Sequence, residues 1–250
     1  MANPMDPRLG GAPTLGRARA GLDAAAYDEG LRAYMLGVYN YMISGVLLTG
    51  MVALAMAYTG AVSLLFNPAT GGASLLGWVV MLSPLAFVFL LGFRWQTMSE
   101  GAMKTTFFAF SAIMGASLSS IFLVYTGASI ATTFFATAAA FAGLSLYGYT
   151  TKRDLSGLGT FLIMGLVGLI VAMLLNLVLQ SGTLAFVVSI VGVLLFAALT
   201  AYDTQRIKSM YDMVAGSDMA GKTAIMGALS LYLNFINMFS FLLQFLGQRE

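Results

Sequence analysis

Asp203 is the one acidic residue that hydropathy places inside an apolar segment of this 250-residue sequence. It lies in Ala201-Tyr-Asp-Thr-Gln-Arg-Ile-Lys208, near the end of the sixth such segment. A carboxylate within a membrane segment is costly and usually faces a bundle interior or an aqueous cavity, so Asp203 is a candidate functional residue. If the segment ends a few residues earlier, Asp203 is instead a solvated residue that pairs with Arg206 one helical turn away.

Two amides, Asn234 and Asn237, lie in the last apolar segment, shortly after Tyr232. Their spacing of three residues places both amides on one helical face. The last two apolar segments are joined by a short loop, so their helices can be antiparallel neighbours, with Asn234 within reach of Asp203 as a hydrogen-bond donor. The alternative interpretation is structural, because buried amides commonly form interhelical hydrogen bonds worth about 0.6–2 kcal/mol.

The sequence contains no cysteine and no histidine. Their absence excludes disulfides, thiolate nucleophiles, Ser–His hydrolysis, histidine-ligated haem and nearly every transition-metal site. Carboxylate, amine, hydroxyl and amide chemistry remain. We therefore expect no enzymatic activity, no catalytic residue and no cofactor.

The segment Gly216-Ser-Asp-Met-Ala-Gly221-Lys222-Thr223 matches the phosphate-loop pattern G-x-x-x-x-G-K-T. A functional phosphate loop follows a buried strand and opens a helix within a parallel sheet. This one lies between two predicted membrane helices, in a chain whose pattern predicts no sheet. We therefore expect Gly216 and Gly221 to form a turn, and we expect neither a nucleotide nor a nucleic acid to bind.

The elements that must position these residues are membrane helices. Hydrophobic residues make up 59% of the chain and charged residues 9%, against about 25% charged in an ordinary soluble domain. Apolar segments long enough to cross a bilayer recur, and lipid requires every backbone polar group to be paired within the segment, which favours helices. The sequence predicts an all-α bundle of seven transmembrane helices, at roughly 33–58, 74–93, 104–125, 129–149, 158–180, 183–206 and 224–247.

The distribution of Lys and Arg predicts the orientation of this bundle, because basic residues near span ends stay in the cytoplasm. The connections 59–73, 126–128 and 181–182 contain no charged residue. The basic residues before and between the spans all fall on the other face: Arg8, Arg17, Arg19, Arg32, Arg94, Lys104, Lys152, Arg153, Arg206, Lys208 and Lys222. We predict a cytoplasmic N-terminus and a C-terminus on the opposite side of the membrane.

The chain divides into two parts by composition. Residues 1–32 contain Pro4, Pro7 and Pro13, several glycines and mixed charges, so we expect a disordered, uncleaved cytoplasmic tail. Residues 33–250 form the predicted membrane domain. Within it, small residues repeat every four positions in the third segment and are dense in the fourth, which predicts that both helices lie inside the bundle.

Two stretches near the C-terminus carry a family resemblance. The sequence Ala228-Leu-Ser-Leu-Tyr-Leu-Asn-Phe-Ile-Asn-Met-Phe239, together with 201–208, resembles the last two spans of the Bax inhibitor-1 family, the transmembrane Bax inhibitor motif proteins. The match is strong over 183–247. Over 33–247 as a whole, the seven spans and the orientation resemble the bacterial, YccA-like members. The resemblance implies a location in the inner (plasma) membrane of a bacterium, with a periplasmic C-terminus.

The resemblance implies a helical bundle in which two acids on different spans sense pH and gate a calcium leak. Asp203 stands at the position of the first acid, whereas Asn234 occupies the position of the second. It also implies that an arginine from the second span, here Arg94, can latch this pair. Two neighbouring carboxylates share a proton, which an Asp–Asn pair cannot do, so the resemblance implies a weaker pH response or one at lower pH.

The resemblance therefore implies a pH-modulated cation leak, with calcium as the candidate ion, gated near Asp203 and Asn234, and we place Arg206, Asn237 and Arg94 in supporting positions. A single carboxylate is a poor calcium site, since calcium prefers six to eight oxygen ligands, so we expect no metal-binding cluster. The alternative function is regulatory: some bacterial relatives bind and restrain a membrane-anchored ATP-dependent protease, and a disordered tail suits partner binding.

Overall fold

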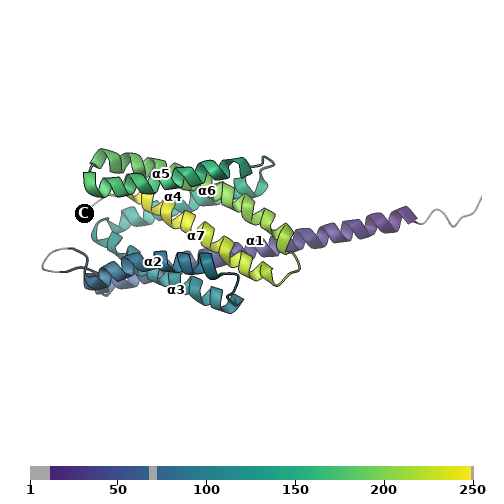
Figure 1. Ribbon diagram of the computed structural model, residues 1–250, viewed down its shortest axis with the longest axis horizontal. Helices are drawn as coiled ribbons and strands as arrows, with labels where there is room; N and C mark the ends of the chain where they lie inside the picture. The colour runs from purple at the N-terminus through teal and green to yellow at the C-terminus, as the bar shows by residue number, and fades with distance from the viewer. Residues whose placement is uncertain (1–11, 68–71, 249–250) are drawn as a thin grey trace, which may run out of the picture.

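The structure, a computed structural model, describes residues 12–67 and 72–248, and the side chains from residue 25 onward. Seven of the described helices are long and apolar enough to cross a membrane, and together they form one bundle (Figure 1). No strand occurs among the described residues, which confirms the predicted fold class. The long helices are α1 (Ala12–Tyr58), α2 (Leu75–Arg94), α3 (Glu100–Leu118), α4 (Gly127–Thr150), α5 (Gly159–Leu179), α6 (Gly182–Val214) and α7 (Met219–Leu246). Short 3₁₀ helices are η2 (Ala61–Leu65), η3 (Ser119–Leu123) and η4 (Ser156–Leu158).

The N-terminal part of the chain differs from our expectation of a disordered tail over residues 1–32. Helix α1 begins at Ala12, so residues 12–32 are helical and continuous with the first span, while residues 1–11 lie outside the described part. The sequence before the span is rich in alanine, which has the highest helix propensity, and a helix already nucleated by the span extends at little cost. We gave too much weight to the prolines when we predicted disorder, because they lie before or at the start of the helix, where proline is tolerated.

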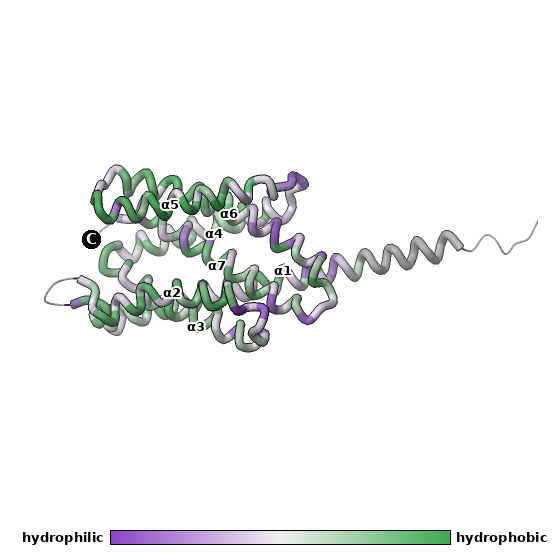
Figure 2. Tube along the Cα trace, viewed as in Figure 1, coloured by the Kyte–Doolittle hydropathy of each residue, from purple (hydrophilic) through white to green (hydrophobic). Residues whose placement is uncertain are grey.

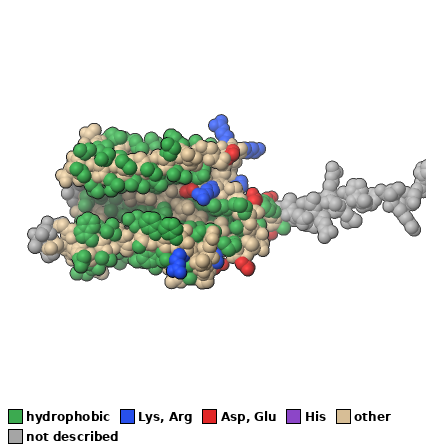
Figure 3. Space-filling model, viewed as in Figure 1, with side chains coloured by type: hydrophobic (Ala, Val, Ile, Leu, Met, Phe, Trp, Pro, Cys, Tyr) green, Lys and Arg blue, Asp and Glu red, His purple; other side chains and the backbone are tan. Residues whose placement is uncertain are grey.

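The two ends of the bundle differ in charge. Figure 2 shows apolar spans with polar segments concentrated at the end from which α1 projects, and in Figure 3 the visible Lys and Arg side chains lie toward that same end. Helix α7 ends at the opposite end of the bundle (Figure 1). We call the first of these the basic end, defined by the connections α2–α3, α4–α5 and α6–α7.

The basic end gives a topological prediction. The connection between α6 and α7 comprises residues 215–218, shorter than the 209–222 indicated by hydropathy, because α6 extends beyond its apolar part. We expect reporter tags at the N-terminus and within 215–218 to be cytoplasmic, and a tag after Glu250 to be periplasmic. The measurement is a paired phosphatase and fluorescent-protein fusion assay, and a cytoplasmic tag after Glu250 contradicts the predicted orientation.

Helix α7 is the central helix of the bundle. Of the most apolar stretch of α7, 67% is buried, against 11% for α5. It packs against α1, α3, α4 and α6, whereas α2 packs on α3, and α5 packs on α6, at the periphery. Large apolar side chains that face outward on the peripheral helices form the surface that lipid covers (Figure 3). Residues of α7 are therefore placed to meet several other helices.

Small residues allow the helices to approach closely, as predicted for the third and fourth spans. A Cβ at Gly115 of α3 would lie 2.5 Å from the carbonyl oxygen of Thr49 in α1. A Cβ at Gly148 of α4 would collide with the carbonyl oxygen of Ala201 in α6. Helix α4 is thereby fixed against α6 immediately before Asp203.

We expect Gly148→Leu to destabilise the bundle because the α4 and α6 backbones would have to separate. The expected decrease in the free energy of unfolding is about 1–3 kcal/mol, the usual cost of overpacking. Gly143, on the same helix, has no neighbour within 4 Å of an added Cβ, so Gly143→Leu is the matched control, with a change below about 0.5 kcal/mol. Unfolding titrations in mixed micelles compare the two variants, and equal effects contradict this packing.

Candidate functional site

Asp203 and Asn234 meet across the interface between α6 and α7. The Asn234 Nδ2 donates a hydrogen bond to the Asp203 Oδ2 at 2.7 Å. Asn234 is buried, with 5% of its surface exposed, and Asp203 is half-buried. The sequence left this hydrogen bond possible, and the structure contains it; the role of the pair as a gate stays a prediction. A charged oxygen that accepts from an amide is the stronger kind of hydrogen bond, so this contact fixes the two helices in register.

Arg206 lies one turn beyond Asp203 and does not pair with it directly. Its side chain is exposed, and the one ion pair among the described residues is Lys104–Glu100. Asp203 is thus held by an amide from the bundle interior, and the positive charge of Arg206 acts on it through space. This arrangement leaves the Arg206 guanidinium available for other contacts at the basic end.

The structure does not bring Asn237 or Arg94 to the pair. The Asn237 Nδ2 donates to the Leu233 carbonyl of its own helix at 2.8 Å. Arg94 is the last residue of α2, which packs against α3, and its side chain is exposed. No contact described for Arg94 joins its guanidinium to Asp203, so its role as a latch remains a prediction.

A row of hydroxyls beside the pair was not predicted from the sequence. The Tyr39 hydroxyl of α1 and the Ser145 Oγ of α4 share a hydrogen bond of 2.6 Å. Ser145 Oγ and the Thr204 Oγ1 of α6 share another of 3.0 Å. Because Thr204 follows Asp203 directly, this row connects α1 and α4 to the part of α6 that carries the carboxylate.

Tyr232, noted in the sequence, is completely buried at a second polar contact. Its hydroxyl shares a hydrogen bond of 2.6 Å with the Thr49 Oγ1 of α1, which also donates to the carbonyl of Ser111 in α3 at 2.8 Å. The ring packs edge-on against Phe107 and Phe110. This contact joins α1, α3 and α7, and it fixes the α7 helix one turn or less before Asn234.

The described residues contain no group of three or more His, Cys, Asp or Glu side chains placed to hold a metal ion. The Asp203–Asn234 pair supplies one carboxylate and one amide, fewer oxygens than a calcium site requires. The pair is therefore suited to holding two helices together, rather than to binding a metal ion.

The phosphate-loop match has a structural explanation. Gly216 has φ +73°, the left-handed region that favours glycine, and it forms the turn after α6. Gly221 lies against the Glu100 carboxylate, which would have to move to make space for a Cβ. The Lys222 Nζ donates to the Gln96 carbonyl at 3.3 Å. The segment follows a helix, so the strand that a phosphate loop requires is absent from its described surroundings.

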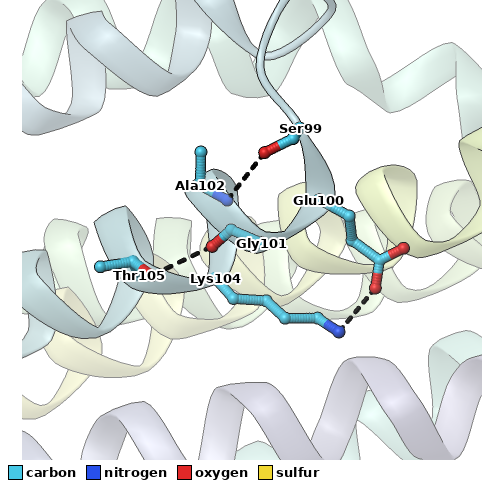
Figure 4. Close-up of polar contacts among 6 residues, drawn as sticks. All are labelled: Ser99, Glu100, Gly101, Ala102, Lys104 and Thr105. Carbon is cyan, nitrogen blue, oxygen red and sulfur yellow. Dashed lines mark hydrogen bonds and ion pairs between the residues drawn. The ribbon is translucent and has the colours of Figure 1, made fainter.

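Figure 4 shows how the start of α3, which Gly221 contacts, is fixed. The Ser99 Oγ accepts a hydrogen bond from the Ala102 amide at 3.2 Å, as expected of an N-cap. Lys104 Nζ pairs with Glu100 Oε1 at 2.6 Å along the same helix face. The Glu100 carboxylate is therefore compensated within α3, and Gly221 and Lys222 serve to dock the α6–α7 connection on it.

We expect Lys222→Ala to leave stability and function nearly unchanged. The side chain is near the surface and makes one long hydrogen bond, so its loss should cost less than about 0.5 kcal/mol of unfolding free energy. Titration with labelled ATP is the second measurement. Saturable ATP binding that Lys222→Ala abolishes contradicts the structural interpretation of the segment.

Comparison with known proteins shows which family the sequence of this chain matches. Residues 31–250 match the sequence model described as "Inhibitor of apoptosis-promoting Bax1". The chain is 47% identical over 224 residues to the inner membrane protein YbhL of Escherichia coli, covering 88% of this chain and 94% of that protein. It is 46% identical over 228 residues to an uncharacterized protein of Rickettsia prowazekii, covering 90% and 93% respectively. An uncharacterized protein of Caulobacter vibrioides is 46% identical over 226 residues, covering 88% and 90%.

Proposed function

This chain belongs to the Bax inhibitor-1 family, and on that premise we propose that it is an inner-membrane cation leak closed by the Asp203–Asn234 contact. The hydrogen bond of 2.7 Å between these residues is the observation that supports the proposal most directly. It joins the central helix α7 to α6 through the one acid that the apolar part of α6 contains. Calcium is the candidate ion, and pH modulates the leak through Asp203.

The surroundings of the pair fit a closed conformation. A groove of about 780 Å³ opens between α1 and α4, close to the row of hydroxyls formed by Tyr39, Ser145 and Thr204. Its other lining residues are mainly apolar, such as Phe141 and Phe235, the residue after Asn234. Apolar surfaces exclude hydrated ions, so passage along this lining requires α6 and α7 to separate at the pair.

The direct test is calcium entry into liposomes that contain the purified protein and a calcium dye. We expect entry without any partner protein and a rate that varies with pH between about 5 and 8, where a buried carboxylate can titrate. Protein-free liposomes from the same lipid preparation are the control. The absence of entry at every pH in that range contradicts the proposal.

The alternative function is the regulation of a membrane-anchored ATP-dependent protease. The length of α1 favours it, because α1 begins at Ala12, well before the apolar segment predicted at 33–58, so this helix extends beyond the predicted span. The same preparation distinguishes the two functions. Co-purification of a protease, combined with calcium-tight liposomes, supports the regulator. Neither function requires catalysis by this chain.

A further inference from the structure

A second cavity, which we call the basic pocket, lies between the α4–α5 connection and α6. It has a volume of about 310 Å³. Three cations line it: Lys152 and Arg153 from the connection, and Arg206 from α6. Tyr202 and Ser209 of α6 also line it, and the Ser209 hydroxyl donates to the Arg206 carbonyl at 2.8 Å. None of the three cations forms an ion pair within the described part of the chain.

The walls of the basic pocket are held together by Gln205. Its Oε1 accepts from the Leu155 amide at 2.7 Å, and its Nε2 donates to the Arg153 carbonyl at 2.8 Å. Leu155 is buried beneath the connection. The amide thereby ties a connection of unpaired basic residues to α6, so that Arg153 and Arg206 face one cavity before any ligand arrives. A preorganised site loses less entropy on binding.

Asp154, the acid that lines the basic pocket, already accepts hydrogen bonds from a nearby residue. The Asp154 Oδ1 and Oδ2 accept hydrogen bonds from the Ser156 amide and the Ser156 hydroxyl, each at 2.9 Å. These two donors lower the pKa of Asp154, which lies in the connection between two spans. The carboxylate therefore stays ionised and directed at Ser156. Three cations against this one anion leave the pocket with a formal charge of +2.

The basic pocket also adjoins the lipid-facing surface. Ser156 opens the short helix η4, and the next turns carry Leu158 and Phe161, which are 45% and 71% exposed. Helix α5 packs on α6 and turns most of its apolar surface outward. A ligand with an anionic head in the pocket can thus lay acyl chains along α5. Basic pockets at the ends of membrane helices are suited to acidic headgroups.

From this geometry we propose that Lys152, Arg153 and Arg206 form a binding site for a phosphate group at the basic end of the bundle. Guanidinium groups bind phosphate oxygens in pairs, and lysine adds a point charge. An anionic phospholipid and a soluble phosphate compound both carry this group. Phosphate binding here does not require ion conduction, because Lys152 and Arg153 lie in the α4–α5 connection and binding is measured without ion flux.

The test uses the purified full chain in neutral detergent and two probes, phosphatidylglycerol and inorganic pyrophosphate. Native mass spectrometry counts retained lipid, and calorimetry measures pyrophosphate binding. The variant is Lys152→Gln with Arg153→Gln, which keeps the Arg153 carbonyl that Gln205 binds. We expect its affinity for the bound probe to fall about 30-fold, because each basic residue near an anionic headgroup contributes about fivefold.

The matched control is Arg32→Gln with Lys222→Gln, which removes the same charge from the same end but outside the basic pocket. We expect it to retain the wild-type affinity. Binding of phosphatidylglycerol alone identifies a lipid headgroup site, and binding of pyrophosphate alone identifies a soluble ligand; both support the proposal. Equal losses in the two double variants, or no binding of either probe by the wild type, overturn it.

Discussion

Asn234→Asp is expected to bring the pH dependence of calcium entry into liposomes toward neutral pH. In the wild-type protein, Asn234 donates to Asp203 at 2.7 Å, so one carboxylate titrates beside a neutral donor. Two carboxylates at such a distance cannot both be ionised and share a proton instead. Protonation and deprotonation of that pair alter the α6–α7 contact within about pH 5 to 8. We therefore expect a steeper response in this range than in the wild type.

Two further variants make this experiment specific to the pair. Asp203→Asn removes the titrating group, so its calcium entry should be independent of pH over the same range. Asn237→Asp introduces the same charge three residues further along α7, where the amide bonds to its own helix, and it should keep the wild-type profile. If the Asn234→Asp and wild-type profiles coincide, or Asp203→Asn keeps the pH response, this pair is not the gate.

The membrane architecture could be predicted from the sequence because each span leaves its own signal. All seven predicted segments correspond to helices, and most of their ends differ from the prediction by a few residues. Helices α1, α3, α6 and α7 continue further into the basic end than predicted. Those extensions contain polar residues. Hydropathy detects only the apolar part of a helix that lies in the bilayer, so it does not detect them. The helix over 12–32 was missed for a different reason: its proline, glycines and mixed charges indicated disorder, although its alanines favour a helix.

That Asn234 can reach Asp203 could be predicted, because their helices are consecutive in the sequence and a short connection joins them. The contacts of Thr49, Tyr39 and Ser145 could not. Most hydroxyls in these helices bond to the carbonyl four residues earlier, as Thr200 does with Phe196 at 2.7 Å, so the residue type does not reveal which hydroxyl bonds across helices. That choice depends on helix rotation, which close contacts such as Gly148 determine.

The core around Tyr232 shows what stabilises the helix that carries Asn234. Tyr232 is fully buried between Phe107 and Phe110 of α3, and its hydroxyl is bound to Thr49 of α1. In a bilayer the removal of apolar surface from water contributes little, because the separated helices are already in hydrocarbon. Stability at this position comes from close packing and from the hydrogen bond, and the two contributions can be measured separately.

We expect Tyr232→Ala to lower the free energy of unfolding by about 3 kcal/mol, the low end for a truncated aromatic residue, since the cavity term remains while the transfer from water is absent. Tyr232→Phe keeps the ring and loses one hydrogen bond, which should cost about 0.6–1.7 kcal/mol. Phe93, 82% exposed at the lipid surface of α2, is the control, and Phe93→Ala should change stability by less than about 0.5 kcal/mol. Reversible unfolding in mixed micelles orders the three variants. A loss in Tyr232→Phe equal to that in Tyr232→Ala means that the hydrogen bond with Thr49, rather than ring packing, holds α7 to α1 and α3.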